Sequence, residues 1–181
     1  MLKGQPRTVL LRYFAGLTEH AFCSRLGVAD PPMIDYLSDM LVRFIRSDVI
    51  FRVRDISGHS LTEVAEMLVE AEARLGAARR EVHRHIGDFI LFCAGVYPEA
   101  LQRMQRTESK DHLLNDCAQG KRAYYIASRI TVDEDREEEA PSAVLERLSE
   151  QFELCMYGLG EVRREWESRD SDDGPQTFLI N

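Results

Sequence analysis

Residues 60–96, which read SLTEVAEMLVEAEARLGAARREVHRHIGDFILFCAGV, decide the fold class. Apolar side chains recur through this stretch in alternating steps of three and four residues, and only His85 interrupts them. That spacing places one apolar stripe along an α-helix. Ser60 and Glu63 have the spacing of a capping box, which satisfies unpaired amide donors where a helix begins. The stretch therefore predicts a long helix over about 60–96.

A second stretch, residues 141–168, repeats the pattern. Its apolar positions step by three and four residues, as in a coiled coil or a left-handed bundle. They are Leu145, Leu148, Phe152, Cys155, Leu159, Val162 and Trp166. We predict a second long helix here. Gly76 and Gly87 mark places where the first helix can bend, while Gly95, Gly158 and Gly160 allow another backbone to approach closely.

Weaker helical periods cover residues 8–26, with a break expected near 16–18, and residues 32–46 and 110–130. Residues 49–55 alternate weakly and are the best strand candidate. The glutamates at positions 63, 66 and 70, with Arg74, predict a charged outer stripe on the first long helix.

The whole pattern predicts an all-α fold: a single-domain helical bundle of five to seven helices over residues 1–168. An acidic linker at 131–140 joins its last parts. Residues 169–181 are expected to form a flexible acidic tail with an apolar end.

Charge argues against a nucleic-acid ligand. The chain has 181 residues with 23 basic and 31 acidic side chains, a net charge of −8, whereas nucleic-acid affinity comes largely from Lys and Arg. No apolar run approaches the roughly 20 residues that a membrane-spanning helix needs. The four cysteines, Cys23, Cys93, Cys117 and Cys155, form no Cys-x-x-Cys pair, which is typical of free thiols in a reducing cytosol. We expect a cytoplasmic protein.

Asp88 is the most informative polar residue. It precedes the most apolar run of the chain, and an ionised carboxylate near a core is costly unless it is paired. Arg84, one helical turn earlier, is the expected ion-pair partner, with Tyr124 or Tyr125 as a hydroxyl donor. Two interpretations stay open: a structural buried pair, or a ligand-binding site formed by His85, Asp88, Arg84 and Tyr124.

Metal binding has only weak candidates. Glu81 and His85 are four residues apart and share a helix face, but di-iron helical proteins use a repeated Glu-x-x-His, which this sequence lacks. We predict no metal centre and no cofactor. His83 is expected to be exposed, and His85 to be partly buried.

The functional prediction is a non-enzymatic helical protein that acts through association, with a protein partner or with itself. Its expected interaction residues are Leu159 and Trp166 on the second seam, together with the apolar end of the tail, Phe178, Leu179 and Ile180. The alternative is a helical bundle that binds a small ligand or a metal near His85 and Asp88, either as a binding protein or as an enzyme. A weaker third hypothesis is a nucleic-acid regulator that uses Arg79, Arg80 and Arg84.

Overall fold

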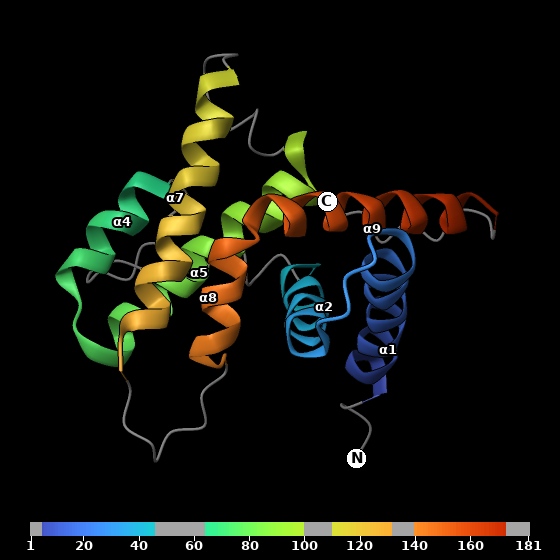
Figure 1. Cartoon of the computed structure of the whole chain (residues 1–181), viewed down its shortest axis with the longest axis horizontal. Helices are drawn as coiled ribbons and strands as arrows, with labels where there is room; N and C mark the ends of the chain where they lie inside the picture. The colour runs from blue at the N-terminus through green and yellow to red at the C-terminus, as the bar shows by residue number, and fades with distance from the viewer. Residues whose placement is uncertain (1–4, 46–63, 100–109, 132–139, 173–181) are drawn as a thin grey trace.

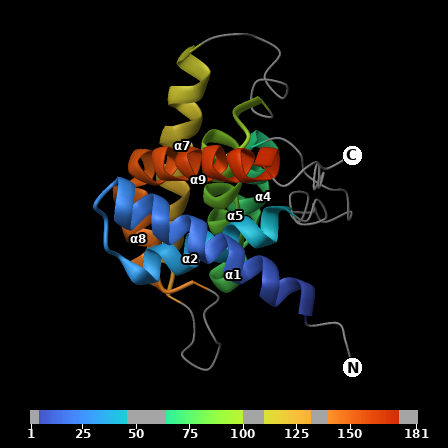
Figure 2. The ribbon, with the colours of Figure 1, turned by 90° about the vertical axis from the view of Figure 1, so that its right-hand side faces the viewer.

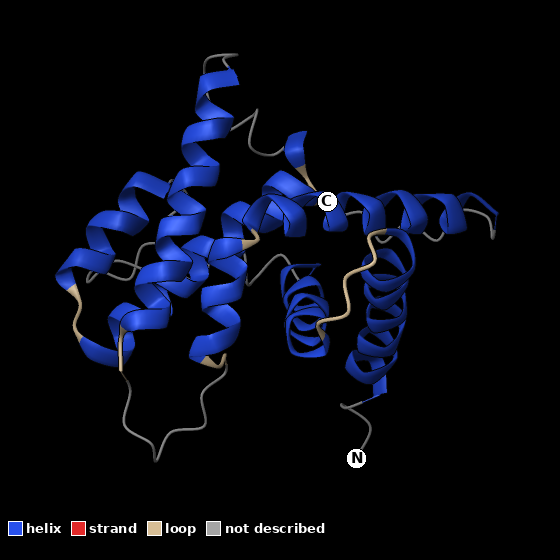
Figure 3. Cartoon of the chain, in the orientation of Figure 1, coloured by secondary structure: helices blue, strands red, loops and turns tan. Residues whose placement is uncertain are grey.

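The computed structural model describes residues 5–45, 64–99, 110–131 and 140–172. These residues are 88% helical, with seven α-helices and no strand, so the all-α prediction is confirmed (Figures 1 and 3). The elements in chain order are α1 (Gln5–Glu19), the π-helical turn η1 (His20–Arg25), α2 (Pro31–Ile45), α4 (Val64–Ala73), α5 (Gly76–Gly95), α7 (Lys110–Arg129), α8 (Ser142–Glu150) and α9 (Phe152–Asp172). None of the described helices has the length and apolarity to cross a membrane.

Helix α5 is the centre of the bundle. Fourteen of its 20 residues are buried, and it packs against α2, α4, α7 and α9. Helix α1 lies on the outside, against α2 and α9, as the view onto α1 and α9 shows (Figure 2). The core therefore forms around α5, which is the second half of the stretch 60–96 from which the fold class was predicted.

The prediction of one helix over 60–96 is wrong. Helix α4 ends at Ala73, and α5 begins at Gly76 after an extended Leu75. Gly76 has φ +54°, a left-handed conformation that glycine adopts without strain. The apolar period runs on through the break because α4 and α5 pack against each other, so both keep an inward face. Of the two expected bending points, Gly76 marks the break, whereas α5 continues through Gly87.

The prediction of one helix over 141–168 is also wrong. Gln151, with φ −109° and ψ 28°, separates α8 from α9, and the two helices run in different directions (Figure 1). The 3-4 seam survives because only one residue leaves the helical conformation. Helix α9 continues to Asp172, so the first four residues of the predicted flexible tail are helical.

The shorter helices match their predicted periods. The period over 32–46 corresponds to α2 (Pro31–Ile45), and the period over 110–130 corresponds to α7 (Lys110–Arg129). The expected break near 16–18 is wrong, because α1 continues to Glu19 and the hydroxyl of Thr18 donates to the Phe14 carbonyl at 2.7 Å. The strand candidate at 49–55 lies outside the described residues, as does most of the acidic linker.

Glycines set the closest helix contacts, as the sequence predicted. A Cβ on Gly95 of α5 would lie 2.7 Å from the Leu159 Cβ of α9, so only glycine permits this crossing. A Cβ on Gly158 would lie 2.3 Å from the Phe22 ring of η1. Gly160 lies at the same crossing as Gly95, with ordinary van der Waals spacing. These glycines therefore allow close contacts between helices of the same chain.

Candidate functional site: a buried cluster around Asp88

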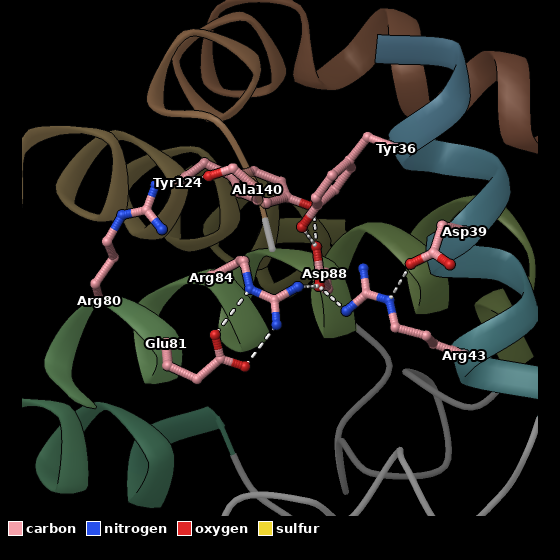
Figure 4. A network of polar contacts seen from close by, with 9 residues as sticks. All are labelled: Tyr36, Asp39, Arg43, Arg80, Glu81, Arg84, Asp88, Tyr124 and Ala140. Carbon is pink, nitrogen blue, oxygen red and sulfur yellow. Dashed lines mark hydrogen bonds and ion pairs between the residues drawn. The ribbon is translucent and has the colours of Figure 1, made fainter. Parts of the chain in front are cut away.

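Asp88 lies in the middle of α5 with no exposed surface and accepts four hydrogen bonds. Its Oδ1 accepts from the Tyr36 hydroxyl of α2 at 2.6 Å and the Tyr124 hydroxyl of α7 at 2.8 Å. Its Oδ2 accepts from Arg43 of α2 at 3.1 Å and Arg84 of α5 at 3.4 Å (Figure 4). One carboxylate thus joins three helices.

Two further carboxylates, Asp39 and Glu81, extend the cluster to the surface. Arg84 donates to Glu81 through Nε at 3.0 Å and through Nη2 at 2.5 Å. Arg43 forms an ion pair with Asp39, Nε to Oδ2, at 3.0 Å. Charges therefore alternate along Asp39, Arg43, Asp88, Arg84 and Glu81 (Figure 4). The carboxylates at the two ends, Asp39 and Glu81, are about 40% exposed, so the row of ion pairs is buried at its centre and reaches solvent at both ends.

The surroundings of the four donors in the cluster favour their protonated forms. Burial raises the pKa of Tyr36 and of Tyr124, and the Asp88 charge raises both further, so both hydroxyls remain donors at physiological pH. Burial, the largest single cause, acts to lower the pKa of Arg43 and of Arg84, but Asp88 and Tyr36 together, with Glu81 at Arg84, outweigh it and both pKa values are raised. The donors of the cluster keep their protons.

This arrangement is suited to holding helices together. An ionised carboxylate offers about four acceptor positions, and here four protein donors use them. No acceptor position is left for a substrate or a metal ion. The geometry supports the structural interpretation of Asp88 and gives no support to a carboxylate that faces a ligand.

The sequence found part of this cluster. Asp88, Arg84 and Tyr124 are brought together as expected, whereas Tyr125 is 51% exposed. His85 lies in the core but stacks on the Phe44 ring, with centroids 5.7 Å apart. It is more deeply buried than predicted, at 4% exposure.

Sequence reasoning missed Tyr36 and Arg43 of α2. They are seven residues apart, two helical turns, and so share one side of the helix. The available signal was Arg43 itself, a cation within the apolar run MLVRFI. A cation in such a run needs an anion from another helix.

The arginines of the third hypothesis are mostly engaged inside the protein. Arg80, 6% exposed, donates to the carbonyls of Ala127 at 3.2 Å and Ala140 at 2.7 Å. Figure 4 draws Arg80 beside the Asp88 cluster. It thereby satisfies a carbonyl in the last turn of α7 and ties the segment before α8 to it. Arg84 is bound to Asp88 and Glu81. Neither guanidinium is presented to a phosphate.

Of the weak metal candidates, Glu81 is engaged by an arginine. Glu81 is bound to Arg84, and among the described residues no group of three His, Cys, Asp or Glu side chains is placed to hold a metal ion. All four cysteines are free, and only Cys23 is exposed. Burial raises the pKa of Cys93 and of Cys155 to about 12, so these thiols remain protonated.

Two of the predicted interaction residues, Leu159 and Trp166, lie in the part of the chain that the structure describes, and both pack inside the bundle. Leu159 has no exposed surface. Trp166 is half-buried and packs edge-on against Phe14 of α1, with ring centroids 5.2 Å apart. Phe178, Leu179 and Ile180 lie outside the described residues.

Helix α4 presents an apolar face to solvent. Val69 is 73% exposed, and Ala65 and Ala73, one turn to either side, are exposed as well. Leu75, just beyond the helix, is 82% exposed. Glu70, in contrast, is 8% exposed and binds Arg74 at 2.7 Å.

The predicted charged outer stripe is therefore wrong at position 70. Residues 65, 69 and 73 are four apart and share the outward face. Glu70 lies at the side of the helix, where the Arg74 ion pair compensates the cost of its burial. The outward face is an aliphatic stripe between the exposed Glu66 and Glu72.

Comparisons of the chain with protein-family models, with curated proteins and with solved structures found no match.

Proposed function

We propose that this chain is a non-enzymatic helical protein that binds a protein partner through the outward face of α4. The observation that carries the proposal is the exposure of two apolar side chains, Val69 at 73% and Leu75 at 82%. They belong to the hairpin that α4 forms with α5, in which the charged Glu70 is buried while these apolar side chains face solvent. Contiguous exposed apolar side chains with a polar rim are typical of interaction sites. We refer to Ala65, Val69, Ala73 and Leu75 as the α4 face.

The charges beside the α4 face favour a partner other than a second copy. Glu66 and Glu72 flank the stripe on opposite sides and are exposed. In a two-fold pairing of two α4 helices, each face meets itself, which brings the flanking carboxylates of the two copies together. Like charges oppose such a contact, and the chain already carries a net charge of −8.

The partner that fits is an amphipathic helix with an aliphatic stripe between Lys or Arg residues. Its stripe would cover Val69 and the small side chains of Ala65 and Ala73, which let two helices approach closely. Its basic residues would lie beside Glu66 and Glu72. The proposed location of this association is the reducing cytoplasm, and four cysteines without a disulfide are consistent with it.

The alternative, a ligand site near His85 and Asp88, is less well supported. Four donors of the protein itself use the acceptor positions of Asp88, and the His85 ring stacks on Phe44 in the core.

The test uses two synthetic helical peptides that share a Leu/Ala stripe and differ only in flanking Lys or Glu. Binding of each labelled peptide is measured by fluorescence anisotropy at low and high salt. We expect the Lys-flanked peptide alone to bind, and added salt to weaken it. Burying a valine contributes at least about 1.5 kcal/mol, so Val69→Asp should weaken binding about tenfold or more.

Val9→Asp is the matched control, because Val9 is 66% exposed on α1, away from α4. It should leave peptide binding unchanged. Equal binding of both peptides, or insensitivity to Val69→Asp, would overturn the proposal. A homodimer in native mass spectrometry that Val69→Asp dissociates would replace it with self-association.

A further inference from the structure

His83 of α5 is buried without a hydrogen-bonding partner. Its side chain is 1% exposed, and neither Nδ1 nor Nε2 forms a hydrogen bond. The prediction that His83 is exposed is therefore wrong, because α5 is covered on the sides that pack against α4 and α7. A buried imidazole that binds nothing is rare, since buried polar groups are usually satisfied.

The charged groups that act on His83 come from all three helices around it. They are Arg79 of α5, Glu72 of α4 and Arg122 of α7. Glu72 is already bound by Arg79, Oε1 to Nη2, at 2.8 Å. A proton on His83 would add a third positive charge beside a single carboxylate that already has a cation.

We propose that protonation of His83 weakens the attachment of α4 to α5, which makes α4 a latch that loosens as the pH falls below neutrality. The geometry supports α4 as the element that moves. Helix α4 is only ten residues long and packs chiefly on α5, whereas α5 and α7 are joined through Asp88 and Tyr124. Displacing α4 would let water reach the imidazolium. This inference holds whether or not α4 binds a partner.

The direction of the pH effect follows from linkage. Burial lowers the pKa of His83 from 6.5, and Arg79 and Arg122 lower it further, while Glu72 opposes them. The closed state therefore binds fewer protons than the open state, in which the imidazole has its ordinary pKa. The stability of the closed state is fully present above pH 6.5 and is lost as the pH falls below that value.

The experiment is amide hydrogen exchange of the full chain at pH 7.5 and pH 5.5, with each rate divided by its intrinsic rate. One pH unit below an open-state pKa of about 6.5, proton uptake favours opening by roughly tenfold. We expect exchange within α4 to rise by up to that factor, and exchange within α5 and α7 to change little. His83→Leu should remove this response, while His20→Leu, at an exposed histidine, should preserve it.

Three results would overturn the proposal. They are an unchanged α4 between the two pH values, an equal acceleration in all helices, and a pH response that survives in His83→Leu. If His83→Leu does not fold, a titration of the His83 ring by NMR in the wild-type chain decides the matter. A ring pKa at or above 6.5 would rule the latch out.

Discussion

Replacing Asp88 by asparagine removes the charge that joins α2, α5 and α7 while it keeps the size of the side chain. The amide oxygen can still accept from Tyr36 and Tyr124, but the new NH₂ group then faces the guanidinium donors of Arg43 and Arg84. Arg84 is 2% exposed and Arg43 is 14% exposed, so water cannot solvate either group fully. The variant leaves buried positive charge without its central anion.

The expected loss of stability is large. Breaking a buried ion pair by removing one partner costs about 3–5 kcal/mol. Against a total stability of about 5–15 kcal/mol for a typical domain, that is a substantial fraction. For a chain of this size, each kcal/mol shifts Tm by about 2–4 °C, so we expect a fall of roughly 6–20 °C.

Urea unfolding followed by circular dichroism at the helix band measures this loss. Tyr124→Phe is a milder second variant, because it removes one donor to Asp88 and leaves the ion pairs in place. A hydrogen bond to a charged group contributes about 1.5–3 kcal/mol. Tyr125→Phe is the matched control, since Tyr125 is 51% exposed and should change stability by less than about 0.5 kcal/mol.

The reasoning would be refuted if Asp88→Asn and Tyr124→Phe both stayed within about 1 kcal/mol of the wild type. An Asp88→Asn chain of unchanged stability that lost a bound small molecule in native mass spectrometry would instead favour the ligand-binding alternative.

Further predictions concern glycines and cysteines. Gly87→Ala should destabilise the chain by about 1–3 kcal/mol in the same urea assay, because its Cβ would lie 2.7 Å from the Tyr124 ring that holds Asp88. Gly16→Ala, in α1 with no atom within 4 Å of the new Cβ, should stabilise it by about 0.5–1 kcal/mol; a loss of stability there would contradict the packing. A thiol reagent should modify Cys23 rapidly in the native chain and the other cysteines only after unfolding, and fast modification of more than one thiol would contradict the burial of Cys93, Cys117 and Cys155.

The sequence predicted the helices better than their ends. The 3-4 apolar period identified the stretches that are helical in the described residues, because burial of one face imposes that period wherever a helix packs. It could not locate the breaks at Leu75 and Gln151, since each takes so few residues that the period continues through it. Gly76 was recognised as a place where the helix can bend, but a glycine in the sequence does not show whether a helix bends there or ends and a new helix begins.

The Asp88 cluster shows a similar division. Arg84 and Asp88 are one helical turn apart, so their pairing follows from local geometry and was predicted. Tyr36 and Arg43 reach Asp88 only because α2 packs against α5, and a contact between distant segments has no local signature. The one signal in the sequence was Arg43, a cation in an apolar run that needs an anion from another helix. The outward α4 face was misread for a related reason: Val69 and Glu70 are neighbours, and the period alone assigns Glu70 to the solvent.

The position of the cluster explains why α4 is the element to which both proposals lead. Asp88 binds side chains from α2, α5 and α7, so displacing any of these helices exposes an unpaired buried charge. On α4, in contrast, Glu70 and Glu72 bind arginines that belong to α4, α5 or the turn between them, Arg74 and Arg79. Opening α4 therefore breaks apolar contacts such as that of Met67 without stranding a charge of the central cluster. A helix held in this way can expose an aliphatic face and respond to one imidazole while the rest of the bundle stays closed.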